Sequence, residues 1–80
     1  MNNELLEKII DNLKGSWEIK DFSLVGMGWA AKISNGTDLF TLHSERGWID
    51  IYIGNYSDQN KAGSSKSFEE VAKVINGKTA

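Results

Sequence analysis

The sequence alternates apolar and polar residues from Trp29 to Ile53, and this alternation restricts the fold more than any other feature. A period of two is the spacing of side chains on one face of a β-strand. Two glycine-containing segments, Asn35-Gly36 and Glu45-Arg46-Gly47, interrupt the pattern and are typical of tight turns. The region is therefore predicted to form three antiparallel strands that share one apolar face.

A fourth strand is predicted over residues 17–25, although its alternation slips in the middle. The apolar residues of its first half and of its second half fall in opposite phases. An extra residue near Lys20–Asp21, as in a β-bulge, would bring them to the same face. The inner face of the sheet is then predicted to hold Phe22, Leu24, Trp29, Ala31, Ile33, Phe40, Leu42, Ile49, Ile51 and Ile53.

The strongest local turn signal is Asn35-Gly36, which predicts a two-residue loop of type I′. That loop would pair Ser34 with Thr37. In the following pair of strands, Leu42 is predicted to lie near Ile51, because a slip of one residue would turn polar side chains toward the core.

Two amphipathic helices flank the strands, over Asn3–Lys14 and Phe68–Asn76, each with apolar residues at the helical period. Ser67 begins a capping box for the second helix. The polar segment 55–66 is predicted to be an exposed connection. The sequence therefore predicts one α+β domain over residues 1–80, in two layers. A four-stranded antiparallel meander is covered on one face by the N- and C-terminal helices, in the order α-β-β-β-β-α.

Composition excludes several kinds of chemistry. The sequence has no cysteine, so it cannot form a disulfide, a thiol nucleophile or a thiolate metal site. His43 is the only histidine, and no serine is placed beside it as a nucleophile. No run approaches the roughly 20 apolar residues of a membrane span, and the N-terminal residues lack the features of a signal peptide. We therefore expect a cytoplasmic protein that is not an enzyme and has no metal or cofactor.

The outer face of the sheet is the predicted binding surface. Trp48 and Tyr52 alternate with isoleucines that the core requires, so they are predicted to point away from the helices, with Asp50 between them. Aromatic side chains of this kind are enriched at the centres of protein interfaces. The predicted partner-binding residues are Trp48, Asp50, Tyr52, His43, Arg46 and Lys32.

Three alternatives for this face follow from the same residues. The aromatic pair could pack under the connection 55–66, it could be buried in a homodimer, or it could stack on the bases of single-stranded nucleic acid. Direct binding of nucleic acid is disfavoured by charge, because residues 17–54 hold five acidic and three basic residues. Another protein is therefore the expected partner.

In layout, the chain resembles small acidic phage proteins of the anti-CRISPR inhibitor type. The elements that carry the resemblance are the helix Asn3–Lys14, the turn Asn35-Gly36 and the segment Ser67–Asn76. The resemblance implies an inhibitor that occupies the nucleic-acid-binding surface of a nuclease complex. Because the net charge is only −2, the sequence favours a mixed aromatic and acidic contact over purely electrostatic mimicry.

Overall fold

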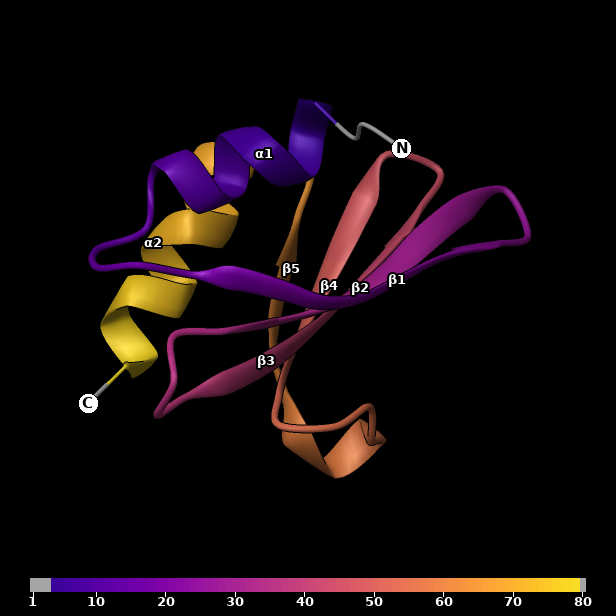
Figure 1. Cartoon of the computed structure of the whole chain (residues 1–80). Coiled ribbons are helices and arrows are strands. Elements are labelled where there is room, and N and C mark those ends of the chain that lie inside the picture. The colour runs from indigo at the N-terminus through magenta and orange to yellow at the C-terminus, as the bar shows by residue number, and fades with distance from the viewer. Residues whose placement is uncertain (1–3, 80) are drawn as a thin grey trace.

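Two helices lie against one face of a five-stranded antiparallel sheet in the computed structural model, which describes residues 4–79 (Figure 1). The helices are α1 (Glu4–Asp11) and α2 (Phe68–Lys78). The strands are β1 (Glu18–Val25), β2 (Gly28–Ser34), β3 (Leu39–Glu45), β4 (Trp48–Ile53) and β5 (Lys61–Ser65), with a short 3-10 helix, η1 (Asp58–Asn60), before β5. The strands follow one another in space as they do in the sequence, so the sheet is a meander. The predicted class, α+β with an antiparallel sheet and two helices, is confirmed.

The predicted number of strands is wrong, because the segment expected to be an exposed connection contains β5. This strand pairs with β4, with Ile49 opposite Ser65 and Ile51 opposite Gly63. Its sequence has no apolar alternation, and it forms because β4 offers a free edge to its backbone. The strand also lies against α2: a Cβ on Gly63 would be 3.9 Å from Val74, an ordinary van der Waals distance.

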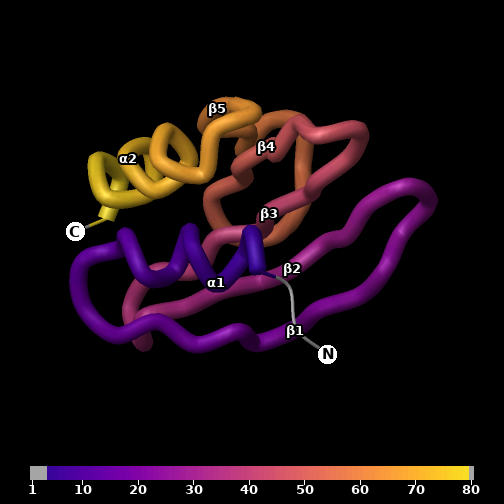
Figure 2. The backbone as a smooth tube through the Cα atoms, turned by 90° about the horizontal axis from the view of Figure 1, so that it is seen from above, coloured from indigo at the N-terminus to yellow at the C-terminus, as the bar shows by residue number. Residues whose placement is uncertain are grey.

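The predicted bulge in β1 is confirmed. Ile19 pairs with Ile33 and Asp21 with Lys32, so Lys20 is the extra residue. The bulge brings Phe22 to the inner face, where its ring lies 6.0 Å from the ring of Trp29. Leu24 is nevertheless 64% exposed, contrary to its predicted place in the core. The reason is visible in Figure 2, where the β1–β2 hairpin extends beyond the cover of the helices.

The far end of the inner face is also more open than predicted. Ile53 pairs with Phe40 and so belongs to this face, yet it is 46% exposed because it is the last residue of β4.

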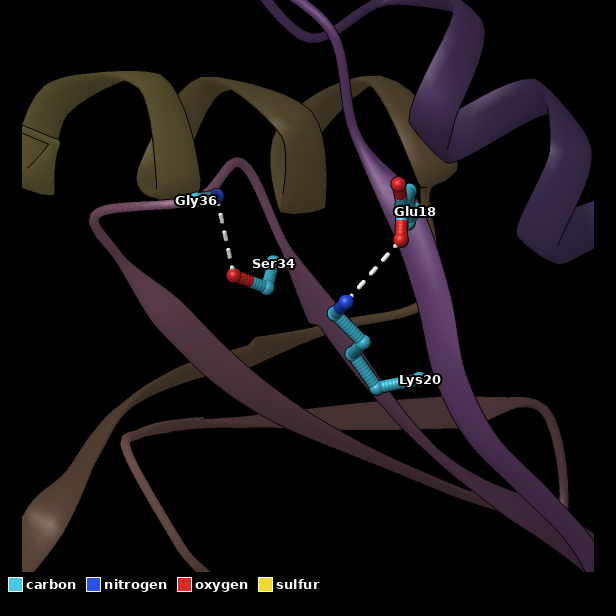
Figure 3. A network of polar contacts seen from close by, with 4 residues as sticks. All are labelled: Glu18, Lys20, Ser34 and Gly36. Atoms are coloured by element: carbon cyan, nitrogen blue, oxygen red, sulfur yellow. Dashed lines mark hydrogen bonds and ion pairs between the residues drawn. The ribbon is translucent and has the colours of Figure 1, made fainter.

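The predicted loop between β2 and β3 is displaced by one residue. Ser34 pairs with Leu39, so Gly36 and Thr37 form the centre of the turn. The side-chain oxygen of Asn35 accepts hydrogen bonds from the backbone N–H groups of Thr37 and Asp38, at 2.9 and 2.6 Å. Figure 3 shows the Gly36 N–H donating to Ser34 Oγ at 3.0 Å. These side-chain acceptors favour the observed turn over the predicted one.

The dihedral angles of the turns agree with this correction. Gly36 has a φ of +96°, but Thr37 does not have a positive φ, so the turn is not of type I′. The pattern of two positive φ values occurs instead between β3 and β4, at Arg46 (54°) and Gly47 (84°). The predicted pairing of Leu42 with Ile51 is confirmed.

The core lies between the sheet and the two helices. Its members are Leu6, Ile9, Leu13, Trp29, Ala31, Ile33, Phe40, Leu42, Ile49, Ile51, Val71, Ala72 and Ile75. The side chain of Asn76 joins the helices, because it donates to the carbonyl of Asn12 at 3.0 Å and accepts from the N–H of Lys14 at 2.9 Å. These two hydrogen bonds satisfy backbone groups that follow α1.

The helix boundaries differ slightly from the prediction. α1 ends at Asp11 rather than Lys14, and its predicted first residue, Asn3, lies outside the described residues. α2 ends at Lys78 rather than Asn76. The predicted cap of α2 is confirmed, since Ser67 Oγ accepts from the N–H of Glu70 at 3.4 Å.

Gly28 is expected to be essential to the close approach of β2 and β3. A Cβ at this position would overlap the carbonyl oxygen of Ser44. Gly28→Ala is therefore expected to lower the free energy of unfolding by about 2 kcal/mol, the usual cost of overpacking. Gly63→Ala is the matched control, and it is expected to cause no loss. Urea melts of both variants measure this difference, and equal stabilities would contradict it.

Candidate functional site

The outer face of the sheet, opposite the helices, contains a hollow of about 280 Å³. Its walls come from β1, β2, β3 and the segment after β4, and its lining residues are Asp21, Ser23, Ala30, Ala31, Lys32, Thr41, His43 and Tyr56. The floor is apolar, since Ala30 lies at its centre between β1 and β3. The border combines the ring of Tyr56 with the carboxylate of Asp21, the amine of Lys32 and the imidazole of His43. We call this feature the outer hollow.

Two of the predicted partner-binding residues line the outer hollow. Lys32 lies opposite Asp21 across the β1–β2 pair, and His43 lies on the neighbouring strand β3. The ring of His43 meets the ring of Tyr56 edge-on, with 6.2 Å between their centroids. The structure therefore brings Lys32 and His43 to the same site, as predicted for one binding surface.

Tyr52 is buried, so its predicted exposure is wrong. Only 4% of its surface is accessible. The chain turns back across the outer face after β4, and the ring centroid of Tyr56 lies 4.6 Å from that of Tyr52. Tyr56 is itself 59% exposed. The alternative in which the connection 55–66 covers this part of the sheet is correct for Tyr52, and Tyr56 takes its place as the accessible aromatic residue.

Asp50 has a partner that the sequence analysis missed. It faces His43 across β3 and β4, and its carboxylate also forms an ion pair with Lys61, at 3.3 Å. Lys61 begins β5, and a segment predicted to be an exposed connection has no register that would place this lysine beside β4. The ion pair partly neutralises the expected negative centre of the outer face.

Trp48 and Arg46 lie away from the outer hollow, at the turn between β3 and β4. Trp48 is 48% exposed, which agrees with its predicted position, and Lys66 Nζ lies 5.3 Å from its ring centroid. This is a cation–π contact. Arg46 is exposed in the turn itself. The predicted surface is therefore divided between the outer hollow and a separate patch formed by Arg46, Trp48 and Lys66.

Six residues that line the outer hollow were not predicted as site residues, and Asp21, Thr41 and Tyr56 are among them. Asp21 and Thr41 could have been found, because the bulge and the alternation place both of them on the outer face. Tyr56 carries no such signal, since the path of the chain after β4 follows no periodic pattern. Its position depends on tertiary packing against Tyr52.

The hydroxyl of Thr41 in the outer hollow is engaged in a hydrogen bond within the chain. The hydroxyl of Thr41 already donates to the carbonyl of Gly54 at 2.7 Å, so His43 is not needed as its hydrogen-bond acceptor. Within residues 4–79, no group of three or more histidine, aspartate or glutamate side chains could hold a metal ion. In the same part of the chain, none of the helices has both the length and the apolar character to cross a membrane.

Comparisons of the chain with protein families, with curated proteins and with solved structures found no match.

The pKa of Tyr52 provides a test of its burial. Removal from water, together with smaller contributions from the nearby Asp50 and Tyr56, raises the pKa of Tyr52 to about 12. An unfolded tyrosine loses its proton near pH 10, so the folded state is stabilised below pH 10 and loses that contribution as the pH rises toward 12. Tyr52→Phe is expected to make the free energy of unfolding fall less steeply over this pH range. Tyr56→Phe is the control that keeps the buried phenol of Tyr52. Urea melts at several pH values measure the free energy of unfolding, and an equally steep fall with pH in the two variants would contradict the prediction.

Arg46 provides a test of the turn between β3 and β4. Its φ of 54° is a left-handed conformation, which asparagine adopts more easily than arginine. Arg46→Asn is expected to increase the free energy of unfolding by about 0.5–1 kcal/mol. Arg46→Lys keeps the conformational cost and is expected to have no effect, so an equal shift of the melting temperature in both variants would contradict this account.

Proposed function

We propose that this chain is a non-catalytic protein-binding module that docks through the outer hollow. The observation that carries the proposal is the hollow itself: a preformed concave site with an alanine floor, an exposed aromatic wall at Tyr56, and charged groups at its border. Pockets for small ligands usually measure about 300–1,000 Å³, so a site of 280 Å³ is better matched to one large side chain from a protein. Interfaces commonly place their strongest contacts in such pockets.

The charge of the site indicates the kind of side chain that would enter it. Asp21 and Lys32 both border the hollow, and they face each other across two strands. An arginine side chain of the partner would lay its apolar stem along Ala30, stack on Tyr56 and direct its guanidinium to Asp21. The net charge of −2 favours an encounter with a basic surface of this kind.

An inhibitor of a nuclease complex is the specific form of this proposal. The basic surface of such a complex binds nucleic acid, and an occupied surface would exclude it. The layout resemblance and the acidic sheet region support this partner class. The Asp50–Lys61 ion pair limits the negative field of the outer face, which supports a contact made through shape and aromatic packing as well as charge.

A substitution that fills the hollow tests the binding surface. Ala30→Leu adds bulk to the floor without changing the charge or touching the core. Thr37→Leu adds an apolar side chain at an exposed turn outside the hollow and is the control. We expect the native chain and Thr37→Leu to capture the same protein from a native lysate, and Ala30→Leu to bind the purified partner at least about 30-fold more weakly, as for loss of a hot spot.

Two outcomes would contradict the proposal. Equal capture by Ala30→Leu, with an unchanged melting temperature, would remove the hollow from the binding surface. Salt-dependent binding of an oligonucleotide by the native chain, lost in Ala30→Leu, would favour the alternative of single-stranded nucleic-acid binding. A nuclease assay with the captured complex then separates an inhibitor from a binding partner that leaves cleavage unaffected.

A further inference from the structure

The free edge of the sheet at β1 carries features of a self-association site. Among residues 4–79, β1 pairs with β2 alone, and Figure 2 shows it as the outermost strand, at the opposite margin of the sheet from β5. Of its eight residues only Phe22 is not exposed, and the exposed ones include Ile19 and Leu24, at 46% and 64%. Long edges of this kind present unused backbone hydrogen-bonding groups along one side.

The bulge restricts what can pair with this edge. Facing residues of an antiparallel pair point to the same face of the sheet. The extra residue Lys20 changes the phase of β1, so that Ile19 and Phe22 share the inner face although three positions separate them. A regular strand can follow this change only as β2 does, by leaving one residue of β1 unmatched. A second copy of β1 contains the same change of phase and can match it residue for residue.

One two-fold register satisfies this condition over residues 18–23 of β1. When Lys20 faces Asp21 of the second copy, Ile19 faces Phe22 and Glu18 faces Ser23. In each facing pair, the two side chains then point to the same face of the sheet. The register also brings Trp17, which packs on Phe40, opposite the exposed Leu24.

Charge selects this register over its neighbours. The two-fold axis makes the Lys20–Asp21 contact occur twice, with opposite charges facing each other. A shift of the axis by half a residue in one direction would place Lys20 opposite Lys20, and in the other direction Asp21 opposite Asp21. Both neighbouring registers bring like charges together. Both also place apolar residues of one copy opposite polar residues of the other.

We propose that two copies of this chain associate through β1 in this antiparallel register, so that one sheet continues across both copies. In the single chain, Lys20 Nζ lies 2.9 Å from Glu18 Oε2 (Figure 3). Both side chains of that pair are more than half exposed, so the pair is readily exchanged for a contact with Asp21 of the second copy. An interface made by one pair of edge strands is small, and the association is therefore concentration-dependent.

Charge reversal tests the register. Lys20→Asp and Asp21→Lys each place like charges opposite each other in the dimer, and each is expected to raise the dimer dissociation constant at least about tenfold. The double variant Lys20→Asp/Asp21→Lys restores opposite charges and is expected to return the constant to within about threefold of the native value. Sedimentation velocity over a range of protein concentrations measures all four proteins, and circular dichroism melts confirm that each is folded.

Three results would overturn the proposal. The native chain could remain a monomer at the highest concentration measured. Both single variants could dimerise like the native chain, which would indicate another interface, such as the patch of Arg46, Trp48 and Lys66. The double variant could stay as weak as the single variants while folded, which would exclude the Lys20–Asp21 contact.

Discussion

The burial of one face of the sheet under α1 and α2 is the constraint on which the rest of the structure depends. Ile33, Phe40 and Ile51 come from three adjacent strands and are at most 1% exposed. Each buried side chain of this size contributes about 1.5–3 kcal/mol relative to its exposed state. A chain of 80 residues without a disulfide has few other sources of stability, so each strand must present its apolar residues to the same side.

This constraint explains which sequence predictions succeeded. The bulge at Lys20 and the pairing of Leu42 with Ile51 both follow from the need to keep apolar residues on one face. The turn at Asn35 shows the limit of the argument. Moving the turn centre by one residue shifts the pairing of β2 and β3 by two residues, and a shift of two leaves every side chain on the same face. The core therefore could not distinguish the predicted loop from the observed one, and the hydrogen bonds of Asn35 decided between them.

The missing predictions concern segments that the core does not constrain. β5 has the sequence Lys-Ala-Gly-Ser-Ser, which carries no apolar alternation, and its pairing is set by the exposed edge of β4. The burial of Tyr52 depends on Tyr56, whose position follows from the path of the chain into η1. The part of the candidate site that lies on strands, including Lys32 and His43, was accessible to sequence reasoning, because the phase of those strands was known. The position of Tyr56 could not be predicted, because it lies in a loop, where no alternating pattern indicates which way a side chain points.

The two edges of the sheet differ in length and exposure, and this difference connects the candidate site with self-association. β5 is short and contacts α2, whereas β1 is long and exposed. Asp21 and Ser23 belong both to the exposed edge and to the border of the outer hollow. A two-fold axis perpendicular to the sheet keeps the outer faces of both copies on the same side. Pairing through β1 would then place two outer hollows next to each other, and a partner that presents two matching side chains would gain avidity without any new kind of contact.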